Sequence, residues 1–188
     1  MRLADRIQKN KESQGIRIVD LCTGTGCIPL LLKSVIPDAH VLGIDVSQNA
    51  VKLSRRNAND NRVDVRFIQA DIFEELPQIK TVDILTSNPP YVLESEYKRL
   101  HRSVRLYEPE IAVHGGDYFY FRILELAEKW EAKIVVLEAG DWPQCQRVKV
   151  FAVEQDWNAS VGFDGASEGR YIVCWRKGYD WANTICDP

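Results

Sequence analysis

The chain has 188 residues, of which 45% are hydrophobic and 27% are charged, and its formal net charge is −3. At ~150 residues per domain this length predicts one domain, and the composition excludes a globally disordered chain. The acidic balance argues against a protein that holds long stretches of nucleic acid by charge alone. Apolar runs such as 28–32 are far shorter than the roughly 18–20 residues of a membrane helix. Residues 1–15 are polar and charged, unlike the apolar core of a secretion signal.

The cysteines predict a reduced intracellular compartment. There are five of them, an odd number, with no Cys-x-x-Cys pair, and the three histidines do not cluster with them. Structural zinc needs four closely grouped ligands, so we expect no metal site.

The hydrophobic pattern predicts strands that alternate with helices. Leu3, Ala4 and Ile7 share one face of a helical remnant within 1–15. Ser47 is a candidate N-cap of a helix whose inward residues include Val51 and Leu53. Strands are expected at 16–21, 41–44, 63–68, 82–86, 134–137, 160–163 and 171–175, and further helices at 28–35, 48–59, 117–130 and 143–154.

This alternation predicts an α/β fold with a mostly parallel sheet covered on both faces. No helix separates the last two strands, so they should form an antiparallel C-terminal hairpin. We expect a helix remnant at 1–15, one catalytic domain at 16–177 and a tail at 178–188. Ligands of such sheets bind beyond the carboxyl ends of the strands.

A glycine turn follows the first strand. Two glycines let a ligand approach the backbone at a helix N-terminus. The third glycine of a dinucleotide fingerprint is absent, and there is no Gly-Lys-Ser/Thr of a P-loop. The candidate cofactor residues here are Asp20, Cys22, Thr23, Gly24, Thr25 and Gly26.

Two further strand ends carry aspartates. Asp45 can accept hydrogen bonds from both ribose hydroxyls of an adenosine. Asp71 can accept from an adenine amino group, with Ile72 against the ring face. Each aspartate has the alternative role of a helix N-cap. Polar features at three consecutive strand ends favour a nucleoside ligand, and the missing phosphate-binding glycines favour S-adenosylmethionine over NAD.

The fourth strand ends in Asn88-Pro89-Pro90-Tyr91, the most specific pattern in the chain. Two prolines stiffen the backbone, so the Asn88 side-chain oxygen and the Pro89 carbonyl can accept both hydrogens of one planar –NH2 group. Tyr91 can stack on that group or form a wall of the pocket. The alternative is a proline-rich turn with a buried tyrosine. An amide or aryl amine is a poor nucleophile, and two fixed acceptors orient it for direct methyl transfer and favour its developing positive charge.

The chain resembles the HemK-like protein-(glutamine-N5) methyltransferases of class 1 peptide-chain release factors. The resemblance covers roughly 16–177 and looks closest to fungal mitochondrial members. Its motifs lie at 20–26, 43–47, 88–91, 107–116 and 137–140.

The resemblance implies a Rossmann-like, seven-stranded class I S-adenosylmethionine-dependent methyltransferase whose product is S-adenosylhomocysteine. It implies that Cys22 to Gly26, Asp45, Ile72 and Asn88 line the cofactor site, and that Asn88 through Tyr91 hold the glutamine of the Gly-Gly-Gln loop. It favours a mitochondrial location, with the cytoplasm as the alternative, and implies neither membrane association nor stable nucleic-acid binding.

The chain departs from the family in three places. Cys22 stands where glycine is usual, so the turn must accept a Cβ there, and Ile72 replaces a bulkier aromatic residue of some members. The family's helical N-terminal domain is not in this sequence, so we expect an excised catalytic domain or a truncated gene model.

Two other functions stay open at this stage. One is N-methylation of an exocyclic amino group of adenine or guanine in nucleic acid, through the same Asn-Pro-Pro-Tyr geometry. The other is a non-catalytic S-adenosylmethionine-binding partner.

Overall fold

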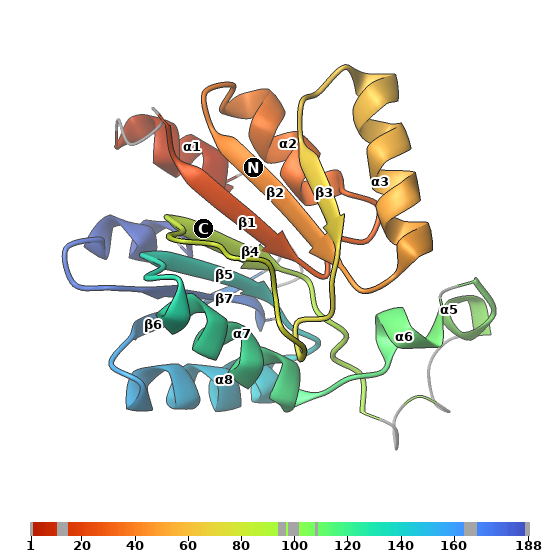
Figure 1. The fold of residues 1–188 in the computed structure, drawn as a ribbon. Coiled ribbons are helices and arrows are strands. Elements are labelled where there is room, and N and C mark those ends of the chain that lie inside the picture. The colour runs from red at the N-terminus through yellow and green to blue at the C-terminus, as the bar shows by residue number, and fades with distance from the viewer. Residues whose placement is uncertain are drawn as a thin grey trace.

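The computed structural model describes residues 2–10, 15–93, 97, 102–107, 109–163 and 169–186. A seven-stranded sheet has the strand order β3-β2-β1-β4-β5-β7-β6 (Figure 1). The strands are β1 (Arg17–Leu21), β2 (His40–Asp45), β3 (Arg66–Gln69), β4 (Ile84–Ser87), β5 (Ile134–Glu138), β6 (Asn158–Phe163) and β7 (Gly169–Trp175). The helices are α1 (Arg2–Lys9), α2 (Cys27–Val35), α3 (Gln48–Asn61), α5 (Arg102–Tyr107), α6 (Glu110–Val113), α7 (Asp117–Lys129), α8 (Trp142–Glu154) and the 3-10 helix η1 (Asp180–Ile185).

The pairing of the strands confirms the predicted mixed sheet. Strand β1 is parallel to β2 and β4, β2 is parallel to β3, and β4 is parallel to β5. Strand β7 is antiparallel to both β5 and β6. The sheet therefore carries the antiparallel hairpin at its C-terminal edge, as expected for a chain whose last two strands have no helix between them.

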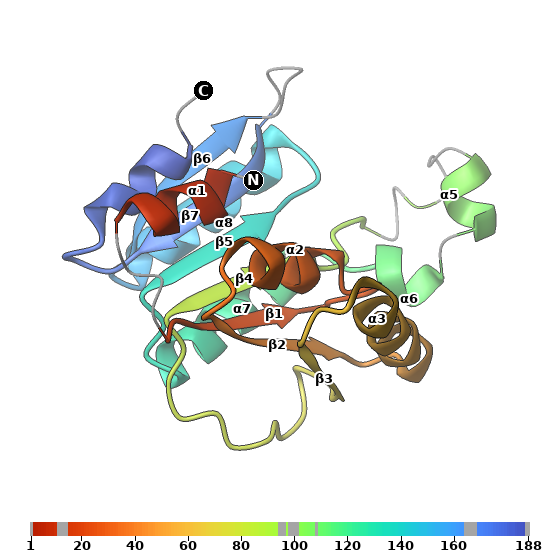
Figure 2. The same cartoon turned by 90° about the horizontal axis from the view of Figure 1, so that it is seen from above.

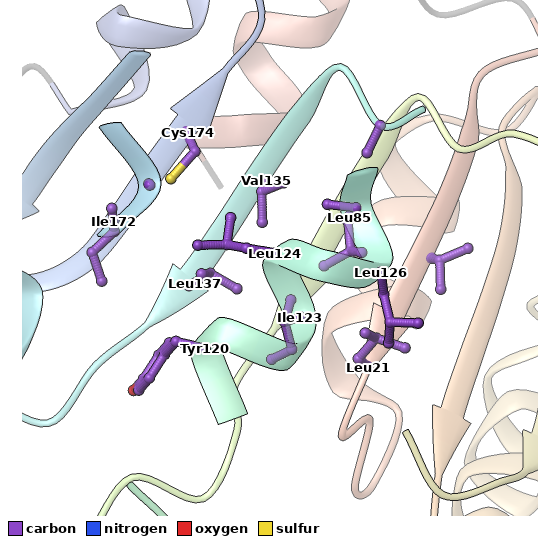
Figure 3. Close-up of a cluster of buried hydrophobic side chains, with 14 of the residues drawn as sticks. Leu21, Leu85, Tyr120, Ile123, Leu124, Leu126, Val135, Leu137, Ile172 and Cys174 are labelled. Atoms are coloured by element: carbon purple, nitrogen blue, oxygen red, sulfur yellow. The ribbon is translucent and has the colours of Figure 1, made fainter. Parts of the chain in front are cut away.

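Helices cover both faces of the sheet (Figure 2). Along β1, Val19 and Leu21 pack in a cluster with residues of α7 and α8, whereas Ile18 packs in a second cluster with residues of α1, α2 and η1. Figure 3 shows the first cluster, in which Ile123 and Leu124 of α7 lie over the strands. Because the central strands are buried on both sides, they are mostly apolar in the sequence, with Asp20 of β1 and Ser87 of β4 among the buried polar exceptions.

The two ends of the described chain meet on one face. Ala4 and Ile7 of α1 belong to the same buried cluster as Ala182 and Ile185 of η1. The Tyr171 hydroxyl of β7 donates to the Ile185 carbonyl over 3.0 Å. Helix η1, which the pattern did not predict, thus completes the cover over this part of the sheet.

Two local predictions are wrong. Strand β3 begins at Arg66 rather than at residue 63, because Val63 still donates its N–H to Ala58 as the chain leaves α3. Leu53 is 42% exposed; it lies about 200° around the helix from buried Val51, and the inward positions are taken by small Ser54 and Ala58.

Among the described helices, none has the length and apolarity needed to cross a bilayer.

Candidate functional site

The site lies where the direction of the strand order reverses. In the strand order, β2 and β3 lie to one side of β1, whereas β4 and β5 lie to its other side. Leu21, the last residue of β1, is in register with Ser87, the last residue of β4. The Ser87 hydroxyl donates to the Leu21 carbonyl over 2.8 Å. The segments that follow these strands therefore leave the sheet side by side, at the position where open α/β sheets bind ligands.

The turn after β1 is built from residues in left-handed backbone conformations. Cys22 has φ +55°, although it carries a Cβ, and Gly24 has φ +54°. Position 22 is where the resemblance predicts glycine. The structure accommodates cysteine there at a conformational cost, because a residue with a Cβ rarely has a positive φ. A Cβ added to Gly24 would meet no atom within 4 Å, so the space in front of the turn is open to a ligand.

Asp45 joins the ends of β1 and β2. One carboxylate oxygen accepts the Gly24 N–H over 2.8 Å, and the other accepts the Ser47 N–H over 2.8 Å. Each oxygen retains a second lone pair, so the carboxylate can still accept from hydroxyls of a ligand. Asp45 is half-buried beside the open space at Gly24. The structure thus brings together the predicted glycine turn and the predicted ribose acceptor.

Asp20 lies beneath this turn, with only 1% of its surface exposed. Its two oxygens accept from the hydroxyls of Thr23 and Thr86, each over 2.6 Å. Burial raises the pKa of Asp20 to about 7, although both hydroxyl hydrogen bonds oppose that shift. Asp20 therefore links the turn to β4 from below, and its direct contact with a cofactor stays a prediction.

The segment after β3 carries the candidate adenine-binding residues Asp71 and Ile72. Asp71 accepts the Phe73 N–H over 2.9 Å, so one of its oxygens serves a local turn. Ile72 is only 5% exposed, and its carbonyl accepts from Nε of Arg122 over 2.7 Å. Phe73 is 44% exposed and lies against Phe119, with ring centroids 5.1 Å apart. The roles of Asp71 and Ile72 toward an adenine stay predictions.

The loop after β4 exposes Asn88 and buries Pro89 and Pro90, and Tyr91 is half-buried. The next residue pairs with a distant segment. Val92 donates its N–H to Val113 over 3.0 Å and accepts the Gly115 N–H over 2.9 Å.

Through this pairing, the C-terminal end of the motif at 107–116 is hydrogen-bonded to the residue that follows Asn-Pro-Pro-Tyr. Of that motif, Glu108 lies outside the described residues.

Sequence reasoning missed Gln144, and it missed the contact that Gly140, within the motif at 137–140, makes with the loop. Gly140, which follows β5, lies against the Tyr91 ring; a Cβ on Gly140 would be 2.8 Å from Cδ2 of Tyr91. Gln144 in α8 donates to the Tyr91 carbonyl over 3.3 Å. No local pattern signals these contacts, because about 50 residues separate the partners in the chain.

Residues 2–105 match the family model of the methyltransferase small domain. The chain belongs to this family. Its cofactor is accordingly S-adenosylmethionine, as the sequence predicts, and the open turn beside the Asp45 carboxylate is suited to an adenosine with free ribose hydroxyls. The parallel pairing of β1 and β4 places the glycine turn and Asn-Pro-Pro-Tyr at the ends of neighbouring strands.

Two curated relatives indicate a narrower class of methyltransferase than the family model does. The probable MRF1 mitochondrial N(5)-glutamine methyltransferase mtq1 of Schizosaccharomyces pombe is 29% identical over 94% of this chain and 64% of its own length. The release factor glutamine methyltransferase of Thermodesulfovibrio yellowstonii is 37% identical over 80% of this chain and 56% of its own length. The chain therefore spans a little over half the length of these relatives.

A solved structure supports the fold. The N-terminal domain of human METTL16 in complex with SAH superposes with a TM-score of 0.64 at 17% identity, covering 93% of this chain and 67% of that one. At this identity the likeness concerns the fold alone, and it confirms the predicted Rossmann-like methyltransferase architecture.

Proposed function

We propose that this protein methylates the side-chain amide nitrogen (N5) of the glutamine in the Gly-Gly-Gln motif of a class 1 peptide-chain release factor. The observation that carries the proposal is the placement of Asn88-Pro89-Pro90-Tyr91 beside the turn at Cys22–Gly26, across the switch point between β1 and β4. The printed names of the two curated relatives support the same substrate.

The chain offers a specific set of groups for the cofactor. Asp45 would accept from the ribose hydroxyls, while its bonds to Gly24 and Ser47 keep the carboxylate in place. The open space at Gly24 would admit the rest of the molecule close to the backbone. When bound, S-adenosylmethionine supplies an electrophilic methyl group.

Asn88 and Pro89 would provide the acceptors for the substrate amide. The lone pair of an amide nitrogen is delocalised, so the nitrogen needs orientation more than it needs a base. With both hydrogens held, the nitrogen points its remaining lobe toward the methyl carbon. In the transfer, the nitrogen–carbon bond would form as the carbon–sulfur bond breaks, and the nitrogen would then release one proton to water. The acceptors stabilise the positive charge that develops on the nitrogen.

The buried prolines give these acceptors their stiffness. Pro89 and Pro90 lack N–H donors and have restricted φ, so the loop has few alternative conformations. Gly115 lies directly against the Pro90 carbonyl, and the Val92–Val113 hydrogen bond follows immediately. A rigid pair of acceptors loses little entropy when the substrate amide binds, which favours catalysis by positioning.

The test is transfer of a labelled methyl group from S-adenosylmethionine to a mitochondrial-type release factor, with a Gln→Ala version of its Gly-Gly-Gln loop as the control. We expect labelling of the first protein and not of the second, with the added mass on the glutamine by peptide mass spectrometry. Equal labelling of both proteins, or labelling of RNA or DNA in their place, would overturn the proposal.

The mitochondrial name of the Schizosaccharomyces pombe relative supports a mitochondrial location for this activity. Fractionation of cells that produce the full-length protein should recover it with mitochondrial markers. Recovery with cytosolic markers would contradict the location without affecting the proposed chemistry.

A further inference from the structure

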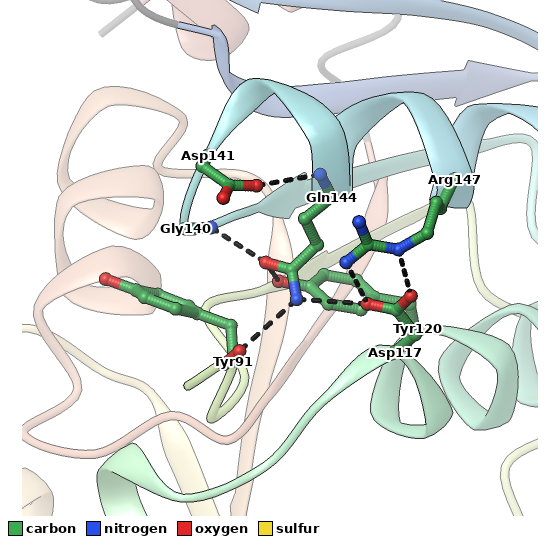
Figure 4. Close-up of polar contacts among 7 residues, drawn as sticks. All are labelled: Tyr91, Asp117, Tyr120, Gly140, Asp141, Gln144 and Arg147. Carbon is green, nitrogen blue, oxygen red and sulfur yellow. Dashed lines mark hydrogen bonds and ion pairs between the residues drawn. The ribbon is translucent and has the colours of Figure 1, made fainter. Parts of the chain in front are cut away.

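Gln144 is a polar side chain in the first turn of α8, and it is only 4% exposed. The N-cap of this helix is Asp141, whose carboxylate accepts the Gln144 backbone N–H over 2.8 Å. The cap fixes the backbone of Gln144, and its side chain points into the space between α7, the end of β5 and the loop after β4 (Figure 4). A buried amide in such a place must find partners for its donors and its acceptor.

The Gln144 amide has partners on both of its ends. Its oxygen accepts the Gly140 N–H over 2.9 Å and lies 3.2 Å from the Tyr120 hydroxyl. Its nitrogen donates to the Tyr91 carbonyl over 3.3 Å and to Asp117 over 3.1 Å. The Tyr120 hydroxyl lies closer to the Glu138 carbonyl, to which it donates over 2.9 Å. The Gly140 N–H faces the oxygen and two acceptors face the nitrogen, so only one orientation of the amide satisfies the site.

The acceptor Asp117 is itself held as a carboxylate. Arg147, one turn further along α8, forms an ion pair with Asp117 over 2.5 Å. Burial tends to raise the pKa of Asp117, but the hydrogen bonds from Arg147 and Gln144 outweigh it and lower the pKa below its ordinary value. An ionised carboxylate can only accept, so residue 144 must donate. A glutamate at that position would place two negative charges together.

These bonds hold Tyr91 at two points. The Tyr91 carbonyl is bound by the Gln144 nitrogen, and the Tyr91 ring packs on Gly140, whose N–H is bound by the Gln144 oxygen. One side chain thus connects the loop after β4 to the loop after β5. Displacement of that side chain frees Tyr91, which lies two residues after Pro89, the second candidate acceptor.

We propose that Gln144 is a positioning residue for methyl transfer: through Tyr91 it fixes the Asn88–Tyr91 loop in the geometry that holds the substrate amide. The proposal rests on the proposed function and extends it, since Gln144 lies outside the Asn-Pro-Pro-Tyr motif. It predicts an effect on the rate of transfer rather than on binding of the cofactor, whose candidate residues Gly24 and Asp45 follow β1 and end β2.

The test compares Gln144→Glu and Gln144→Met with Gln146→Glu, which makes the same chemical change at a half-buried position of the same helix. Gln144→Met retains the length of the side chain without a charge. It therefore provides a folded variant even if the buried carboxylate prevents Gln144→Glu from folding. With the release factor as substrate, we expect kcat to fall ~10- to 100-fold in both Gln144 variants, as a misplacement near 1 Å would cause. The dissociation constant of S-adenosylhomocysteine should stay within about twofold of the unmutated value, since each variant leaves the cofactor side intact.

The pH profile separates positioning from loss of packing. Burial and the nearby Asp117 should raise the pKa of the introduced carboxyl into the neutral range, and its protonated form can donate one hydrogen bond. Gln144→Glu should therefore regain activity, relative to Gln146→Glu, as the pH falls from about 8 to about 6, whereas Gln144→Met should not. The other titratable or charged groups around this amide are Tyr91, Tyr120, Glu138, Asp141, Cys145, Arg147 and Arg170.

Values of kcat within twofold of Gln146→Glu in both folded variants would overturn the role of Gln144. Failure of the unmutated protein to label any release factor would instead refute the proposed function. In that case amide hydrogen exchange still decides the positioning role: Gly140 and Val92 should exchange faster in Gln144→Met and not in Gln146→Glu. Unchanged exchange at both amides would contradict the role independently of activity.

Discussion

A Cβ on Gly115 would overlap the carbonyl oxygen of Pro90. The two residues are 25 positions apart in the chain, yet the candidate catalytic loop can take its observed path only because Gly115 has no side chain. The hydrogen bonds between Val92 and the 113–115 segment hold this close approach in place. Gly115 is thus part of the support of the candidate site.

Gly115→Ala should therefore impair methyl transfer by shifting the loop. We expect kcat to fall at least ~10-fold, with a loss of stability of about 1–3 kcal/mol from overpacking. Ala112→Ser adds one heavy atom at an exposed position three residues earlier and is the matched control. Kinetics with the release factor and thermal unfolding measure the two effects. A Gly115→Ala protein as active as the control would show that the contact with Pro90 is not needed.

Asp45→Asn should weaken cofactor binding. The carboxylate accepts from Gly24 and Ser47, and an amide can present an oxygen to only one of these donors. A hydrogen bond to a charged group contributes about 1.5–3 kcal/mol, so the dissociation constant of S-adenosylhomocysteine should rise roughly 10- to 100-fold. Calorimetric titration measures it, with Asp64→Asn at an exposed position beyond α3 as the control. Equal affinities of the two variants would remove Asp45 from the cofactor site.

Asp20 should make stability depend on pH across the neutral range. Its pKa is about 7 in the folded protein, against 3.8 for an ordinary aspartate, because burial disfavours the charged form. The folded state therefore binds a proton that the unfolded state has lost, and the free energy of unfolding should decrease as pH rises from about 4 to about 7. Denaturant unfolding at several pH values should show this slope, and Asp20→Asn should flatten it. The same slope in both proteins would mean that another group causes it.

Asp83, at the amino end of β4 and so at the end of the strand opposite to Ser87, should have the reverse pH dependence. Burial tends to raise its pKa, but hydrogen bonds from Arg17 (2.9 Å) and Lys133 (2.7 Å) hold the pKa well below its ordinary value. Its stabilisation is present above pH ~4 and is lost as pH falls through the lowered folded pKa. Asp83→Asn should reduce the free energy of unfolding at pH 7 by on the order of 2 kcal/mol without changing affinity for S-adenosylhomocysteine. Asp60→Asn, which removes an exposed ion pair on α3, should change stability little; equal effects of both variants would contradict the prediction.

The strands of the sheet were predictable from the sequence because a short run of neighbouring residues specifies each strand. The run at 134–137 is apolar along its whole length, and the run at 16–21 is apolar except for Arg17 and Asp20; such runs are typical of strands buried on both faces. The missing helix between the last two strands predicted their antiparallel pairing, and the switch point follows from the order of the elements. Local signals were weaker for amphipathic α3, where Leu53 faces solvent and small Ser54 faces the core.

Of the candidate site, only the residues expected to contact the cofactor or the substrate were predictable from the sequence. The glycine turn, Asp45 and Asn-Pro-Pro-Tyr each carry a recognisable pattern at a strand end. Gln144 lies in no such pattern. Gly115 and Gly140 lie in the motifs at 107–116 and 137–140, but their contacts with Pro90 and Tyr91 were not predictable, because only folding brings these residues together. The exposure of Phe73 beside buried Ile72 also depends on packing, since both residues are apolar and adjacent in sequence.

The most direct test of the central claim is to measure methyl transfer and cofactor binding together in Asn88→Ala, with Asn59→Ala at an exposed position of α3 as the control. Loss of one of two acceptors for the substrate amide should lower kcat for the release factor at least ~100-fold, while the dissociation constant of S-adenosylhomocysteine changes by less than about threefold. An Asn88→Ala protein that methylates the glutamine at the rate of the Asn59→Ala control would contradict the account.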